Sequence, residues 1–191
     1  MRAALLLVPL VVLASAAPGG AAGDAAAPYF PVAPGNRWVL RDSATGVSSS
    51  ISVRGDMGRL VLRGFPGAGD LRVRQVGQAI QAWDASDVRW EAFLRLGLPA
   101  GAKYLVDLQG TGLWRGTTVT ISSRHDTVDD YRGASRRNCV TLTFAYRKPI
   151  ADAGLEAMSF APAVGPVLVR EQTIAGTRER LLDRYVARRP T

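Results

Sequence analysis

The sequence predicts an all-β protein, an antiparallel meander that forms a curved sheet, half-barrel or barrel with few short helices. Two patterns carry this prediction. Short runs alternate apolar and polar side chains, which indicates half-buried strands because successive side chains of a strand point to opposite faces. Turn residues separate these runs at intervals of roughly ten residues, and connections this short join antiparallel neighbours rather than parallel ones.

The clearest alternating run covers residues 88–96. Its apolar face consists of Val88, Trp90, Ala92, Leu94 and Leu96. The opposite face carries Arg89, Glu91, Phe93 and Arg95. The apolar faces of such strands are expected to meet in one core. We predict that this core contains Trp38, Trp90, Leu94, Leu142 and Phe144.

Other runs and turns complete the meander. Alternating runs lie at residues 51–54, 71–74, 118–122 and 140–147. Turn signals rich in Gly, Pro, Asp and Asn lie at residues 34–36, 55–58, 66–70, 84–87 and 99–101. Residues 178–188 fit either an amphipathic helix or a final strand. We favour the strand, since a β meander needs a last strand to close it.

The N-terminus has the order of residues of a secretory signal peptide. Arg2 precedes a short apolar run that ends in Ala14-Ser15-Ala16, a small-x-small cleavage site. The apolar run has about a dozen residues, whereas a membrane-spanning helix needs about 20. We therefore predict export with cleavage after Ala16, and Ala22 is the second choice.

This signal divides the chain into three parts and sets its compartment. The predicted parts are a signal peptide at residues 1–16, a flexible leader at 17–28 and a single β domain at 29–191. No cysteine lies near the cleavage site, so bacterial lipoprotein processing is not expected. No later apolar run reaches membrane length, so we expect no transmembrane segment in the mature chain. The expected location is the periplasm or the extracellular space.

Net charge indicates the kind of partner that the protein attracts, and the cysteine content indicates whether it contains a disulfide. The formal net charge is +8, and removal of Arg2 with the signal leaves +7. A net positive surface favours anionic partners by simple attraction, and the basic residues look most concentrated between Arg170 and Arg189. Cys139 is the only cysteine, so the exported chain has no internal disulfide. We expect its thiol to be buried and inert.

Two segments, one near each end of the predicted domain, resemble sequence motifs of known proteins. Residues 29–38 read YFPVAPGNRW and resemble an opening motif of the type Y-F-P-L-x-x-G-N-x-W, while residues 160–167 read FAPAVGPV and resemble a closing motif of the type W-x-A-P-G-V-G-x-V. Phe160, Ala163 and Pro166 depart from that pattern. The chain thus resembles exported bacterial β-rich proteins of uncharacterised function and, in fold only, half-barrels that carry lipoproteins or lipids. The resemblance implies an envelope or secreted location and a curved antiparallel sheet, and it transfers no functional residue.

Residues with the chemistry for catalysis or metal binding are few. His125 is the only histidine, and its neighbour Asp126 is an acid that a hydrolytic triad would need. Asp126, Asp129 and Asp130 form an acidic cluster without the spacing of a calcium loop. No phosphate-binding loop occurs. We therefore expect no catalytic, cofactor-binding or metal-binding residues and no cofactor.

One basic face has the composition of a nucleic-acid surface. We predict that the outer face of the sheet gathers Arg72, Arg74, Arg89, Arg95 and Phe93. Arginines interleaved with aromatic residues are typical of single-strand binding. An exported protein is not expected to meet nucleic acid, however, so this partner is excluded from the prediction.

Two functional hypotheses remain ahead of an enzyme. In the first, Trp38, Trp83, Trp90 and Trp114 line the mouth of a half-barrel that holds an apolar or amphipathic ligand, such as a lipid or another envelope component; these tryptophans also suit an ordinary core. In the second, the chain is a structural or interaction protein whose basic face meets anionic envelope components. A hydrolase acting through His125 comes third. The sequence itself identifies neither the ligand, the residues that bind it nor the oligomeric state.

Overall fold

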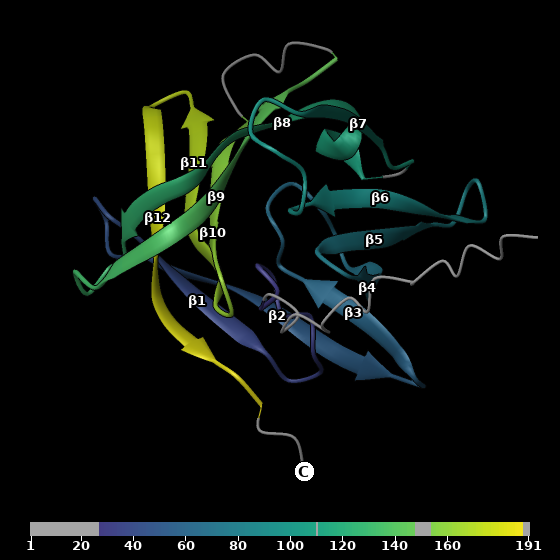
Figure 1. The fold of residues 1–191 in the computed structure, drawn as a ribbon, viewed down its shortest axis with the longest axis horizontal. Coiled ribbons are helices and arrows are strands. Elements are labelled where there is room, and N and C mark those ends of the chain that lie inside the picture. Colours follow the sequence, from purple (N-terminus) through teal and green to yellow (C-terminus); the bar gives the residue numbers. More distant parts are fainter. Residues whose placement is uncertain (1–26, 110, 148–153, 189–191) are drawn as a thin grey trace, which may run out of the picture.

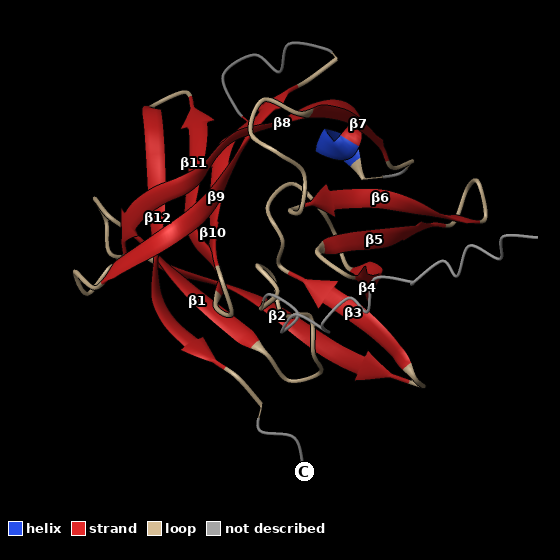
Figure 2. Ribbon diagram, viewed as in Figure 1, coloured by secondary structure: helices blue, strands red, loops and turns tan. Residues whose placement is uncertain are grey.

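The computed structural model describes residues 27–109, 111–147 and 154–188. The predicted signal peptide lies outside the described residues, as does the leader except for Ala27 and Pro28. The described chain forms one twelve-stranded sheet, and its only helix is the short 3-10 turn η1 (Gly112–Trp114) (Figures 1 and 2). None of the described residues thus belongs to a helix that would reach across a membrane. The all-β prediction is confirmed.

The strands follow one another as two antiparallel meanders. The first comprises β1 (Arg37–Asp42), β2 (Ser48–Asp56), β3 (Arg59–Arg63), β4 (Leu71–Val76), β5 (Ala79–Asp84) and β6 (Arg89–Arg95). The second comprises β7 (Lys103–Asp107), β8 (Arg115–Asp129), β9 (Ser135–Ala145), β10 (Gly154–Ala161), β11 (Gly165–Thr173) and β12 (Gly176–Val186). Strand β12 pairs with β1 and joins the two meanders into one sheet (Figure 1). The strand interpretation of residues 178–188 is therefore confirmed for all but the last two.

The sheet curls until its two edge strands meet, but no strand ladder closes it. The edges are β6 and β7. The backbone N–H of Arg95 donates to the Tyr104 hydroxyl at 3.0 Å, and one Arg124 nitrogen donates to the carbonyls of Leu96 and Leu98 at 2.7 and 2.6 Å. Side chains thus hold together two edges that the backbone leaves unpaired. One face of the sheet is consequently concave and the other, the outer face, is convex.

Aromatic rings fill much of the concave side. Trp38 is fully buried and packs edge-on against Phe30 at 4.9 Å, while Phe93 packs against Trp114 at 4.7 Å and Trp114 against Phe144 at 5.3 Å. Each fully buried large side chain contributes about 2–3 kcal/mol to folding. The predicted burial of Trp38, Leu94 and Leu142 is confirmed, and Phe144 is partly buried against this core.

The prediction for Trp90 is wrong, because a β-bulge interrupts the alternation in β6. Ile80 pairs with Leu94 and Gln81 with Ala92, so Phe93 has no partner on β5. An extra residue of this kind moves every side chain before it to the other face. Phe93 and Leu94 are both fully buried, whereas Trp90 lies half-buried on the outer face.

The two end motifs form one structural unit. Trp38 donates its indole N–H to the carbonyl of Val164 at 2.5 Å. Gly165 has φ +106°, and a Cβ there would lie 2.5 Å from the Trp38 indole nitrogen, so only glycine fits. Gly35, in the turn predicted at residues 34–36, likewise has a positive φ, at +89°. Both motifs therefore have a structural role.

Candidate functional site

Among the described residues, His125 and the acid beside it are not joined as a hydrolytic triad would require. His125 is exposed on β8, and its backbone N–H donates to the Ser123 hydroxyl at 3.4 Å. The Asp126 carboxylate accepts hydrogen bonds from the hydroxyls of Ser123 at 2.6 Å and Thr141 at 2.5 Å. Both carboxylate oxygens thus accept from hydroxyls, and no hydrogen bond between described residues joins this acid to the His125 imidazole.

Cys139 is buried, as predicted. Its thiol has no exposed surface and contacts the carbonyl of Arg136 at 3.2 Å. Burial is the main cause that raises the pKa of the Cys139 thiol to about 11. The thiolate, which is the reactive form, is therefore scarce at neutral pH.

The carboxylates of the acidic cluster accept hydrogen bonds from other side chains of the protein. Asp129 accepts from the Ser135 hydroxyl at 2.6 Å, and Asp130 accepts from Arg136 at 2.8 Å. Burial alone would raise the pKa of Asp130, but the Arg136 guanidinium and two backbone N–H groups hold it below its usual value. Across the described ranges, no three His, Cys, Asp or Glu side chains are grouped as metal ligands.

A different part of the molecule, the outer face of β2–β6, brings arginine and tryptophan together. Cross-strand pairing aligns Arg54 with Val61, Val61 with Arg72, and Trp83 with Trp90. Arg72 is adjacent to Val73, which pairs with Ala82, so the same row continues from Arg72 to Trp83. Five neighbouring strands thus each place one side chain in a row across the convex face.

Arg72, Arg74, Trp83 and Trp90 form what we call the arginine–tryptophan cluster. The indole rings of Trp83 and Trp90 lie 5.4 Å apart at an angle of 69°. The Arg72 guanidinium lies 5.0 Å from the Trp83 ring and 5.2 Å from the Trp90 ring, and that of Arg74 lies 4.4 Å from Trp90. A guanidinium held over an indole keeps its N–H edge available to an acceptor, because the contact uses the flat face of the cation.

Apart from Arg63, which pairs with Asp70, and Arg89, which pairs with Asp87 and Glu91, the arginines of this face have no acidic partner in the part of the chain that the structure describes. No carboxylate lies within ion-pair distance of Arg54, Arg59, Arg72 or Arg74 there. Among the described residues, the one side-chain hydrogen bond of these four arginines joins Arg74 to the neutral Gln81 at 2.6 Å. No carboxylate of the described residues therefore neutralises their positive charges through an ion pair.

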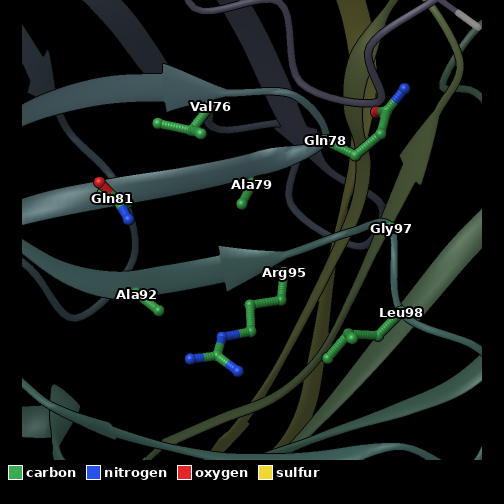
Figure 3. Close-up of a pocket in the computed structure, with 8 residues that line it drawn as sticks. All are labelled: Val76, Gln78, Ala79, Gln81, Ala92, Arg95, Gly97 and Leu98. Atoms are coloured by element: carbon green, nitrogen blue, oxygen red, sulfur yellow. The ribbon is translucent and has the colours of Figure 1, made fainter.

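A groove adjoins the cluster at the ends of β4, β5 and β6. It has a volume of about 350 Å³ and is lined by Val76, Gln78, Ala79, Gln81, Ala92, Arg95, Gly97 and Leu98. Figure 3 shows the short side chains of Ala79 and Ala92 among longer ones, and this difference in length hollows the surface. Arg95 supplies the one charged group of the lining. Because Gln81 both lines the groove and accepts from Arg74, the groove and the cluster are continuous.

The prediction for this face was right for the arginines of β4 and wrong for the aromatic residue. Arg72, Arg74 and Arg95 lie on the outer face, but Phe93 is buried, and Arg89 pairs with Asp87 at 3.2 Å and Glu91 at 2.7 Å. The sequence does hold a signal for the tryptophan pair. Trp83 and Trp90 are equally distant from the 85–88 turn, and residues at equal distances from a hairpin turn face each other.

Comparison with known proteins gives only distant similarities. No family model and no curated protein matches the sequence. Among solved structures, the fold is similar to a protein described as exported, with a YmcC-like fold, from Bacteroides fragilis (TM-score 0.45, 12% identity, 84% of this chain and 100% of that one). It is also similar to a protein described as a lipoprotein from Parabacteroides distasonis (TM-score 0.42, 10% identity, 84% of this chain and 99% of that one). Similarities this low carry no information about a ligand.

Proposed function

We propose that this chain is an exported, non-catalytic protein that binds an anionic component of the cell envelope through the outer face of β2–β6. The observation that carries the proposal is the arginine–tryptophan cluster. Two guanidinium groups lie over two indoles, and no carboxylate of the described chain is within ion-pair distance of either. An anion that binds there receives charge-assisted hydrogen bonds from donors that are already in place.

Several observations favour the outer face over the concave one. Trp38 and Trp114 are packed among other rings instead of lining an open mouth, whereas Trp83 and Trp90 lie on the convex surface. These two buried tryptophans are therefore less accessible to a ligand than the pair on the convex surface. A basic face that meets anionic envelope components agrees better with this packing.

The surroundings of His125 support a binding role over a hydrolytic one. Its ring is exposed on β8, and the neighbouring Asp126 is engaged by Ser123 and Thr141. The only thiol is buried, and its raised pKa disfavours the nucleophilic form.

Tryptophan fluorescence and calorimetry test the proposal with probes of known charge. The anionic probes are phosphatidylglycerol vesicles and polygalacturonate, and their neutral controls are phosphatidylcholine vesicles and dextran. We expect binding to at least one anionic probe, weakened by salt because screening shortens the reach of exposed charges. The double variant Arg72→Gln/Arg74→Gln should lose this binding.

Arg170→Gln is the matched control, since Arg170 is an arginine of similar exposure that pairs with Glu179 at 2.7 Å. It should bind as the unaltered protein does. Failure to bind either anionic probe, or equal binding by the double variant, would contradict the proposal.

A further inference from the structure

We infer that the ligand is a linear acidic polysaccharide that lies across the strands, with three hollows of the outer face as successive subsites. This inference rests on the proposed function and names the class of its ligand. The hollows, charges and hydrogen-bonding groups between β1 and β6 support it.

Three hollows of nearly equal size follow one another on this face. The first, of about 370 Å³, lies on β1 and β2 and is lined by Arg37, Ser50, Ser52 and Arg54 among others. The second, of about 360 Å³, lies on β3 and β4 and includes Arg59, Arg72, Arg74, Gln75 and Trp90. The third is the groove of about 350 Å³ with Arg95. Repeated hollows of one size suit a ligand built from repeated units.

Each hollow offers the same two kinds of partner. Arginines without an acidic partner among the described residues are present in all three, and guanidinium groups bind carboxylates with good geometry. Neutral hydroxyl or amide side chains stand beside them. Ser50 and Ser52 lie in the first hollow, and Gln81 accepts from Arg74 of the second hollow and lines the third. A chain of sugar acids presents carboxylates and hydroxyls in every unit, and so matches this repeated pairing.

The curvature of the sheet favours a flexible chain over a flat surface. The row of hollows crosses the six strands β1 to β6, and so spans about 24 Å at the usual distance between strands. Hydrogen bonds join β6 to Tyr104 of β7 and the residues after β6 to Arg124 of β8. These contacts require the sheet to curl, so this face is convex. A planar bilayer would touch only part of the row, whereas a polymer can follow all of it.

The aromatic pair disfavours nucleic acid as the polymer. Single-strand binders present open aromatic faces on which bases stack. Here Arg72 and Arg74 lie over the indoles, and the two rings are inclined at 69° to each other, which leaves no parallel slot for a base. The cluster provides cations held in position by rings, which suits carboxylates better than bases.

Calorimetry with galacturonate, its trimer and its hexamer tests the inference. Filling several subsites at once should raise the affinity steeply, so that the hexamer binds about a hundredfold more tightly than the single sugar. Arg54→Gln, Arg74→Gln and Arg95→Gln, one for each hollow, should each weaken hexamer binding about tenfold, since each removes a charge-assisted hydrogen bond. Arg170→Gln should leave it unchanged.

Three results would overturn the inference: no rise of affinity with chain length, loss in only one of the three variants, or tighter binding of oligothymidylate or polyglutamate of equal charge. Phosphatidylglycerol vesicles separate this failure from that of the proposed function. If they bind and the Arg72→Gln/Arg74→Gln variant releases them, the anionic surface stands and the polysaccharide is wrong. If no anionic probe binds, both are wrong.

Discussion

Arginines serve opposite purposes in two regions of this sheet. On β11 and β12, Arg170, Arg178 and Arg180 each pair with a carboxylate, from Glu179, Asp42 and Glu171 respectively. On the outer face of β2–β6, five arginines (Arg54, Arg59, Arg72, Arg74 and Arg95) have no acidic partner among the described residues, and two of them cover tryptophan rings. Three of the six arginines between Arg170 and Arg189, the stretch that looks most basic in the sequence, thus have acidic partners. Charge density along a chain therefore does not reveal where a folded protein is basic.

The tryptophans divide in the same way. Trp38 joins the opening and closing motifs and belongs to the core near β12, whereas Trp90 belongs to the outer face of β6. One region uses its large and charged side chains for stability, and the other exposes them. The predictions below test this division.

The largest difference in stability is expected between variants of a core tryptophan and of a surface tryptophan. Trp38→Ala removes a fully buried ring and its hydrogen bond to Val164, so it should lower the free energy of unfolding by about 3–5 kcal/mol. Trp90→Ala should cost about 1–2 kcal/mol, since it loses one ring contact and two cation contacts on the surface. Urea denaturation measures both. Equal losses would show that Trp90 is part of the core after all.

Substitution of an arginine that forms an ion pair should have the next largest effect on stability. Arg180 is mostly buried and donates to Glu171 at 2.5 Å and Ser49 at 3.0 Å. Arg180→Gln leaves Glu171 without its cation, so we expect a loss of about 1–3 kcal/mol in chemical denaturation. If the variant is as stable as the original chain, this region does not depend on its ion pairs.

The stability that Asp42 contributes to the same region should depend on pH. The backbone N–H of Thr45 and then the Arg178 guanidinium hold the pKa of this carboxyl well below its usual range. A depressed pKa adds stability above the unfolded value of about 3.9, and this stability is lost as the pH falls below it. The stability of Asp42→Asn should therefore approach that of the original chain in acid. A constant difference between about pH 6 and pH 3 would contradict this.

The arginines of the outer face should matter least for folding. Arg74→Gln removes no ion pair, so the free energy of unfolding should change by less than about 0.5 kcal/mol. Thermal denaturation beside Arg180→Gln measures the contrast. A large loss would mean that Arg74 has a structural role and would remove the main support for a ligand site.

Strand alternation accounts for most of what was predicted correctly. It identified the buried faces that carry Trp38, Leu94 and Leu142 and the outward positions of Arg72 and Arg74. It failed at Trp90 because a single unpaired residue, Phe93, reverses the faces of β6. A bulge leaves no composition signal of its own, so alternation alone cannot locate it.

The sequence by itself determined the class of fold, since period-two patterning and short turns allow little except an antiparallel meander. It also determined the turn at residues 34–36, where Gly35 supplies a positive φ that the local backbone requires. Only the tertiary structure decided which arginines are neutralised, because their partners come from other strands, as Asp42 does for Arg178. The candidate site likewise depends on pairing across five strands, and contacts between distant segments exist only once the chain has folded.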